Sequence, residues 1–307
     1  MSVLRDRTTD QRLHSVRIVL DRLYLDADSQ QDFTDPIQLV HRYSDPADQE
    51  IVGFLASGLA FGRVTTVIKS VEALLSEMGR SPSSFVREFN LRRANRRIKE
   101  LRHRWIRGHD LVALLAVLRH ILETEGSIEQ FFLRGYDGEA EDIGSALDNF
   151  CTRVRTVDLS LVYRDLKTSP GVWYFFPKPS AGSACKRLNL FLRWMVRHDR
   201  VDCGVWSKVD RSKLVVPLDT HVIRVSQCLR LTSYRSPGWR MATEITKNLR
   251  RLDPDDPVKY DFSMCHLGMQ NACGFSRPQR DQDCPLRGVC LPSYDKPQRS
   301  HQPSARH

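Results

Sequence analysis

Apolar residues recur at helical spacing along almost the whole chain, and this pattern limits what it can fold into. Leu13, Val16 and Leu20 follow the spacing near the N-terminus, and Ile51 and Phe54 follow it later. Residues three or four positions apart lie on one face of an α-helix, whereas a half-buried strand needs strict alternation. Long alternating stretches are absent. The sequence therefore predicts an all-α fold of about ten short helices.

Two helix starts are marked by residues that cap a helix N-terminus. Asp45 precedes Pro46, and proline is favoured at the first position of a helix. Ser127 is followed three residues later by Gln130, which is the spacing of a capping box. We therefore expect helices to begin just after Asp45 and just after Ser127.

The length and composition fit a globular protein. The 307 residues, of which 41% are hydrophobic, are enough for one large domain or two modest ones. No apolar run approaches the roughly 18 residues that cross a bilayer, and the charged N-terminus lacks the apolar stretch of a secretion signal. We expect a cytoplasmic monomer with no membrane partner and no disulfides among its eight cysteines. Residues 291–307 combine Pro with Ser, Gln and Arg, which predicts a disordered basic tail.

The formal net charge of +10 suits a polyanionic partner, and basic residues crowd one stretch. Residues 92–107, which we call the basic segment, contain Glu100 as their only acidic residue and eight basic ones: Arg92, Arg93, Arg96, Arg97, Lys99, Arg102, Arg104 and Arg107. At helical spacing several of these share a face, and we take them as not interleaved with aromatic stacking residues. We expect this segment to contact DNA phosphates, through Arg96, Arg97 and Arg104 in particular. A merely solvated basic helix is the alternative.

A turn that contains Gly182 runs directly into an amphipathic segment with Lys186 near its start. Further along, a short apolar run and Pro217 precede Asp219 and Thr220. Asp219 is placed to cap a helix that Thr220 begins, and a helix N-terminus stabilises a carboxylate in its ionised form. A lysine in a first helical turn or an aspartate cap is, taken alone, more often structural than catalytic.

The two motifs Gly182-Ser-Ala-Cys-Lys186 and Pro217-Leu-Asp219-Thr-His221-Val resemble, in order, the active-site motifs of the helix-hairpin-helix base-excision DNA glycosylases. The 33 positions from Lys186 to Asp219 resemble the archaeal oxoguanine-glycosylase branch more than the endonuclease III branch. Over most of its length the chain resembles a bacterial family that carries only a domain-of-unknown-function label. The strings at 185–189, 191–197 and 256–262 carry that second resemblance.

The glycosylase resemblance implies a two-lobed fold over residues 1–290, with lobe A at about 45–150 and lobe B from about 1–44 together with 151–290. It implies that Lys186 attacks the sugar of double-stranded DNA while Asp219 stabilises the developing charge, so that a flipped base is excised and a Schiff base permits strand scission. The residues that it places against DNA are Gly182, Ser183, Arg187, Asn189 and His221, with Phe61 or Arg63 as the wedge that fills the gap left by the base.

Several alternatives stay open. The chain could keep the fold as a non-catalytic nucleic-acid-binding protein, or it could be an enzyme of this fold that acts on a modified base or structured RNA. Phe61 is equally suited to a place in the core. The target base cannot be named from the sequence, because it depends on side chains from several helices.

The cysteine loop near the C-terminus resembles in part the iron–sulfur loop of endonuclease III, which has the spacing Cys-x6-Cys-x2-Cys-x5-Cys. Cys265, Cys273, Cys284 and Cys290 match only its last spacing. Asp281 stands where the close pair of that loop needs its first thiolate. We therefore expect no cofactor, and the alternative is an iron–sulfur cluster or zinc held by Cys273, Cys284 and Cys290 with Cys265.

Overall fold

The computed structural model describes residues 2–29, 34–163, 170–269 and 284–290. Within these ranges the protein is mostly helical, and its only sheet is a hairpin of two short strands. The predicted all-α class is confirmed. Among the helices of the described ranges, none has a stretch that is both apolar and long enough to cross a bilayer.

The α-helices of the described residues are α1 (Ser2–Ser29), α2 (Pro46–Gly58), α3 (Val64–Met78), α4 (Pro82–Arg87), α5 (Leu91–Ile98), α6 (Gly108–Glu125), α7 (Ile128–Leu133), α8 (Gly144–Val154), α9 (Ser160–Tyr163), α10 (Lys186–Val196), α11 (Thr220–Cys228), α12 (Trp239–Arg250) and α13 (Asp261–Met269). Short 3-10 turns lie at Pro36–Leu39, Gly171–Phe175, Pro179–Ala181 and Arg211–Lys213. Strand β1 (Arg102–His103) pairs antiparallel with β2 (Ile106–Arg107).

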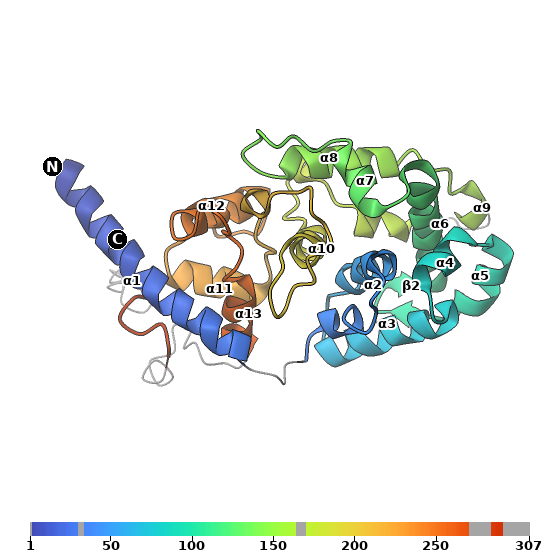
Figure 1. The fold of residues 1–307 in the computed structure, drawn as a ribbon, viewed down its shortest axis with the longest axis horizontal. Coiled ribbons are helices and arrows are strands. Elements are labelled where there is room, and N and C mark those ends of the chain that lie inside the picture. The colour runs from blue at the N-terminus through green and yellow to red at the C-terminus, as the bar shows by residue number, and fades with distance from the viewer. Residues whose placement is uncertain (1, 30–33, 164–169, 270–283, 291–307) are drawn as a thin grey trace, which may run out of the picture. The chain divides into compact units, whose positions relative to one another are not determined.

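The chain forms two compact units, and each is described by itself. The smaller unit consists of the described residues of 1–27, 219–233 and 260–307, and the larger unit consists of those of 28–218 and 234–259. In the larger unit α2 packs against α3, α4 and α10, while α6 packs against α4, α5 and α7 (Figure 1). The boundaries of these units differ from those of the predicted lobes, because residues 151–218 fall in the same unit as 45–150. The lobe boundaries stay a prediction.

Both predicted helix starts are confirmed by their capping hydrogen bonds. Asp45 Oδ1 accepts from the Ala47 amide at 2.9 Å, and Ser127 Oγ accepts from the Gln130 amide at 3.1 Å. Two further amides at the start of α7 are bound by Glu50 on α2. Its carboxylate accepts from the amide of Ile128 at 2.8 Å and from that of Glu129 at 2.7 Å. The N-terminus of α7 is thereby fixed to α2, because orphan amides at a helix start need acceptors.

The central contact of the larger unit is between α2 and α10. Side chains of α10 pack directly over Gly53, where a Cβ atom would lie 2.8 Å from Cε at the flexible end of Met195 and 3.5 Å from the Phe191 ring. Phe54 on α2 meets Phe191 on α10 edge-on, with 5.1 Å between ring centroids, and stacks on Phe176 at 5.6 Å. Such aromatic pairs add about 0.5–1.5 kcal/mol each to the stabilisation from burial alone.

The end of α10 carries two buried arginines that are matched by carboxylates. Arg193 Nε lies 3.1 Å from Asp202 Oδ1, and Arg197 also pairs with Asp202. Arg197 makes further ion pairs with Asp199 and Asp256, each at 2.9 Å. We call these five residues the ion-pair network. Because Asp256 follows α12 in the chain, the network joins α10 to a segment that is distant in sequence.

In the smaller unit, hydrogen bonds connect α1 to the segments around α11 and α13. The Arg12 guanidinium on α1 donates to the carbonyl of Leu229, which follows α11, at 2.6 Å. The Tyr260 hydroxyl, just before α13, donates to Asp21 on α1 at 2.6 Å. Helix α11 packs directly on α13.

We predict that Asp202→Asn lowers the free energy of unfolding by about 3–5 kcal/mol, because removing one partner leaves two buried guanidinium groups without their shared carboxylate. Glu123→Gln, which breaks the exposed pair between Glu123 and Arg119, is the matched control and should cost about 0.5 kcal/mol or less. Urea unfolding followed by circular dichroism measures both. Equal effects of the two substitutions would contradict the prediction.

Candidate nucleic-acid interface

The basic segment does not form one helix. Helix α5 ends at Ile98, and the chain then turns at Arg104 and Trp105 between β1 and β2. Arg104 has a φ of +54°, in the left-handed region that side chains rarely adopt, so helical geometry stops there. The hairpin returns against the end of α5, where a Cβ atom at Gly108 would lie only 2.3 Å from the Ile98 carbonyl oxygen. The expected helical stripe is therefore wrong beyond Ile98.

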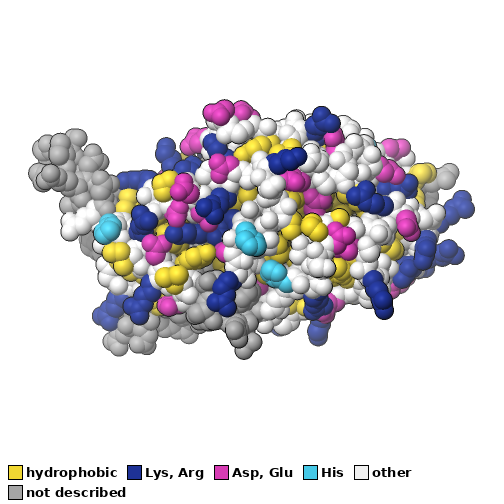
Figure 2. Space-filling model, in the orientation of Figure 1, with side chains coloured by type: hydrophobic (Ala, Val, Ile, Leu, Met, Phe, Trp, Pro, Cys, Tyr) yellow, Lys and Arg dark blue, Asp and Glu magenta, His cyan; other side chains and the backbone are white. Residues whose placement is uncertain are grey.

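The arginines of α5 form two pairs at i, i+4 spacing, Arg92 with Arg96 and Arg93 with Arg97. All four are exposed, and Figure 2 shows Lys and Arg side chains gathered over the part of the view where α5 lies. Arg97 Nε donates to Glu77 at 2.7 Å, whereas the described residues give Arg96 no ion pair. Of these two, Arg96 is thus the better placed to bind a phosphate.

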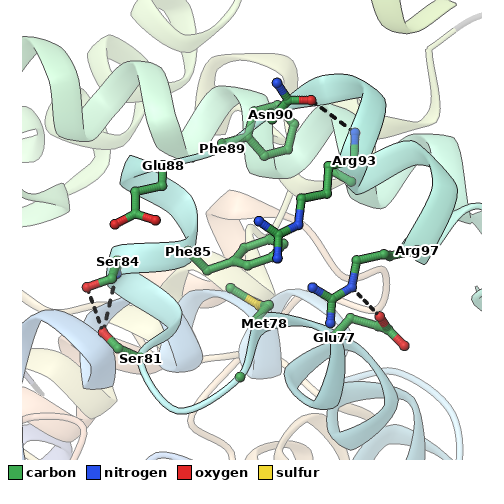
Figure 3. A pocket seen from close by; sticks show the side chains of 12 residues that line it. Glu77, Met78, Ser81, Ser84, Phe85, Glu88, Phe89, Asn90, Arg93 and Arg97 are labelled. Carbon is green, nitrogen blue, oxygen red and sulfur yellow. Dashed lines mark hydrogen bonds and ion pairs between the residues drawn. The ribbon is translucent and has the colours of Figure 1, made fainter.

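A cavity of about 400 Å³ lies between α4, α5 and the end of α3. In Figure 3 the Arg93 side chain reaches across it toward Phe85, and Arg97 is paired with Glu77. Glu88 also lines the cavity. Because carboxylates and guanidinium groups share the lining, the cavity has no clear preference for an anion.

Three aromatic rings meet at the tip of the hairpin, and one of them is exposed. Trp105 is 53% exposed and stacks on Phe61, with 4.7 Å between ring centroids and 29° between planes. Tyr174 meets Phe61 and Trp105 edge-on at 5.2 Å and 5.3 Å. The Arg104 guanidinium lies 5.3 Å from the Trp105 ring centre, within cation–π range. We call Phe61, Trp105 and Tyr174 the aromatic cluster; it corrects the expectation that the basic segment lacks an aromatic stacking residue.

His103 fixes the hairpin to the turn that carries Phe61. Its buried ring places Nδ1 2.9 Å from Ser70 Oγ and Nε2 3.0 Å from the Phe61 carbonyl oxygen. Burial lowers the pKa of His103 by more than the hydrogen bond to Phe61 raises it. The imidazole is therefore neutral at pH 7, and Trp105 is presented by a hairpin with a fixed attachment.

Lys186 is the first residue of α10, and the turn before it has a fixed form. Gly182 and Cys185 both adopt left-handed backbone angles, with φ of +80° and +49°. Ser183 Oγ accepts from the Cys185 amide at 3.2 Å. The half-buried Lys186 amine donates to the carbonyl oxygen of Ala60 at 3.3 Å, which places it beside Phe61.

Arg187 is a buried cation that no carboxylate of the described residues balances. It donates to the carbonyl oxygens of Tyr174 and, at 3.4 Å, Gly58. Its guanidinium also lies 3.4 Å from the centre of the Tyr174 ring. Burial lowers the pKa of Arg187 to about 10, so the group is still charged at neutral pH. Arg187 therefore places a positive charge next to the Tyr174 and Phe61 rings of the aromatic cluster.

Asp219 belongs to the smaller unit, where it caps α11 as predicted. Its Oδ1 accepts from the Val222 amide at 2.7 Å, and its Oδ2 accepts from the Cys265 thiol of α13 at 2.9 Å. His221 follows on α11, and a Cβ atom at Gly268 would lie 2.5 Å from the His221 Cβ, so glycine is required where α13 crosses this residue. Both carboxylate oxygens of Asp219 are therefore occupied within its own unit.

The described residues contain no group of three or more His, Cys, Asp or Glu side chains arranged to hold a metal ion. Cys284 is buried and Cys290 half-buried, while Cys273 and Asp281 lie outside the described residues, as does the predicted tail at 291–307. The expectation for the cysteine loop thus stays a prediction.

The larger unit brings together four residues that the sequence indicated separately, Phe61, Arg104, Lys186 and Arg187. Arg63 is exposed at the start of α3, on the same turn as Phe61. Asn189 is only 1% exposed on α10. Lys186 and Asp219 lie in different units, so their pairing stays a prediction.

Sequence reasoning missed three residues of this candidate interface, Trp105, Tyr174 and His103. One signal was present, since Trp105 lies between Arg104 and Arg107 in the most basic stretch of the chain. Tyr174 and His103 reach the aromatic cluster only through contacts between segments that are distant in sequence, and no local sequence pattern indicates such contacts.

A family model described as a protein of unknown function (DUF2400) matches residues 35–270. The chain belongs to the DUF2400 family. The DUF2400 match confirms the predicted membership of a family with a domain-of-unknown-function label. Searches of curated proteins and of solved structures gave no significant match.

The DUF2400 match includes the basic segment, the aromatic cluster, Lys186 and Asp219. It ends before Cys273, so most of the cysteine loop lies outside it. The family label carries no activity, and the relationship to helix-hairpin-helix glycosylases stays a prediction.

We predict that His103 makes the stability of this DUF2400 protein depend on pH. Its folded pKa lies below the unfolded value of about 6.5, so the unfolded chain takes up the proton first. Its contribution is full above about pH 6.5 and is lost as the pH falls through the folded pKa. Urea unfolding at pH 7.5 and 5.5 should show a larger loss of stability for the wild type than for His103→Gln. The same loss in both proteins would exclude this role.

Proposed function

We propose that this DUF2400 protein binds DNA through its basic segment and acts on the deoxyribose of a damaged or abasic nucleotide, as a helix-hairpin-helix DNA glycosylase with abasic-site lyase activity does. The observation that carries the proposal is the amine of Lys186, which has no ion-pair partner among the described residues and donates to the carbonyl of Ala60, the residue before Phe61 of the aromatic cluster. The all-α class and the two active-site motifs in order support the two-lobed glycosylase-like fold as part of the same proposal.

In the proposed reaction, the uncharged amine of Lys186 attacks C1′ of the sugar and forms a C–N bond. The N-glycosidic bond breaks, and the base leaves with the bonding electron pair and takes up a proton. The nitrogen gives up one proton to water or to a carboxylate, and its lone pair then opens the sugar ring to a protonated Schiff base while O4′ takes up a proton. Loss of a proton from C2′ then breaks the C3′–O bond, and the strand is cleaved with its 3′ phosphate as the leaving group. Asp219 would stabilise the positive charge that develops on the sugar.

The second candidate is a non-catalytic nucleic-acid-binding protein, and one observation favours it. The carboxylate of Asp219 caps α11 and accepts from Cys265, so its position has a sufficient structural explanation. The two candidates share the DNA-binding surface and differ only in whether covalent chemistry occurs. Binding and catalysis therefore need separate tests.

For binding, we predict affinity for duplex DNA that falls steeply with salt, because phosphate contacts release bound counterions. Arg96→Ala should weaken binding to all sequences and lower the slope of log Kd against log salt by about one. Arg42→Ala removes an exposed arginine outside the basic segment and should change neither. Fluorescence anisotropy at several salt concentrations measures both quantities. Affinity that is unaffected by reversing Arg96, Arg97 and Arg104 together to Glu would remove the basic segment from the interface.

For catalysis, we predict that borohydride traps the wild type covalently on a duplex that carries its target lesion or an abasic site. Lys186→Gln should abolish trapping and strand scission, because no other amine is assigned to the reaction. Asp219→Asn should slow every step by about two orders of magnitude or more. Denaturing gels that resolve the trapped adduct and the cleaved strand measure these effects across a panel of damaged bases.

Lys178→Gln is the matched control, because Lys178 donates to Thr152 and takes no part in the proposed step. It should trap as the wild type does. DNA binding without trapping on any substrate would favour the non-catalytic candidate. Trapping that survives Lys186→Gln would show that the nucleophile lies elsewhere.

A further inference from the structure

Among the described residues, none packs over the exposed part of the aromatic cluster. Phe61 covers one face of the Trp105 indole, and Tyr174 meets the two rings at their edges. The indole nevertheless remains 53% exposed, which makes it one of the most exposed large apolar side chains of the described residues. An indole that is stacked on Phe61, lies within cation–π range of Arg104 and keeps about half of its surface exposed offers aromatic area to a second ring.

The charges around the cluster indicate what kind of ring this is. Arg104 lies 5.3 Å from the Trp105 ring centre, and the amine of Lys186 is held next to Phe61 at the Ala60 carbonyl. Arg187 adds its charge within 5.7 Å of the Phe61 ring centre. A flat aromatic ring with an attached anion, such as a nucleobase with its phosphate, matches an aromatic surface surrounded by cations.

The geometry favours a base that is not paired. In a regular duplex the faces of each base are covered by its neighbours, so they cannot stack on a protein ring. A single-stranded, bulged or flipped base has an open face. The hairpin is held by His103 against Ser70 and the Phe61 carbonyl, so the indole is presented without first having to be ordered.

We propose that Trp105, supported by Phe61 and Tyr174, is a stacking platform for one unpaired nucleobase, whose phosphate is contacted by Arg104. The inference rests on the proposed DNA-binding function and narrows its substrate class to nucleic acid with an unpaired base. It assigns the hairpin a part in recognition that is separate from the chemistry at Lys186.

The test compares three labelled oligonucleotides with the full-length protein by fluorescence anisotropy: a fully paired duplex, the same duplex with one unpaired adenine, and its single strand. The wild type should bind the second and third more tightly than the first. Trp105→Ala should weaken binding to those two by about ten- to a hundredfold, the loss expected for one base–aromatic stack, and change binding to the paired duplex by less than about threefold. Trp105→Phe should restore most of the lost affinity.

Two controls keep the result specific. Leu161→Ala removes another exposed apolar side chain of the larger unit and should leave all three affinities unchanged. Trp105→Ala should lower the thermal unfolding midpoint by only a few degrees, because it removes the ring contacts with Phe61 and Tyr174 and leaves the core intact.

The outcomes separate this inference from the function on which it rests. If the wild type binds none of the three oligonucleotides at low salt, both are wrong. If Trp105→Ala weakens all three equally, or weakens none, DNA binding stands and the stacking platform is wrong. A wild type that is dimeric and a Trp105→Ala variant that is monomeric, with no change in any affinity, would instead make this surface a contact between two copies of the chain.

Discussion

The close packing of α2 against α10 is the constraint on which the candidate interface depends. Side chains of α10 pack directly over Gly53, and at the other end of α2 a Cβ atom at Gly58 would lie 2.9 Å from Phe175 Cδ1. This brings the last turn of α2 to the first turn of α10, where Arg187 donates to the Gly58 carbonyl and Lys186 to the Ala60 carbonyl. The amine is therefore positioned by the hydrogen bonds that the first turn of α10 makes to backbone carbonyl oxygens at and just after the end of α2.

Helix α10 buries arginines in two different ways. Arg193 and Arg197, near its C-terminal end, are neutralised by carboxylates that satisfy their donors. Arg187, in its first turn, is held by carbonyl oxygens and aromatic rings, so its charge is not cancelled. Burying a charge without a counterion is costly, and the carbonyl and ring contacts offset part of that cost. The helix thus presents a net positive charge at the end that carries Lys186.

Helix caps and apolar spacing allowed much of the fold to be predicted. The candidate interface could be predicted only in part, because its residues meet through tertiary contacts. Asp45, Ser127 and Asp219 cap helices as their sequence positions indicated, because a cap acts within three residues. The hairpin was missed because arginine-rich sequence favours a helix, and only the return of the chain onto α5 overrides it. The glycosylase resemblance placed Lys186 and Phe61 at one DNA site, but no local pattern reports the contact of Lys186 with Ala60, which lies 126 positions away in sequence.

The two ends of α10 belong to one short, continuous helix. The helix has 11 residues and is therefore about 16 Å long, with the ion-pair network at one end and Lys186 at the other. A short helix transmits a shift at one end almost undiminished to the other, because its backbone hydrogen bonds hold its length. A substitution in the network that displaces the end of α10 would therefore also displace Lys186, so the ion pairs that stabilise the fold and the position of the amine share one structural element.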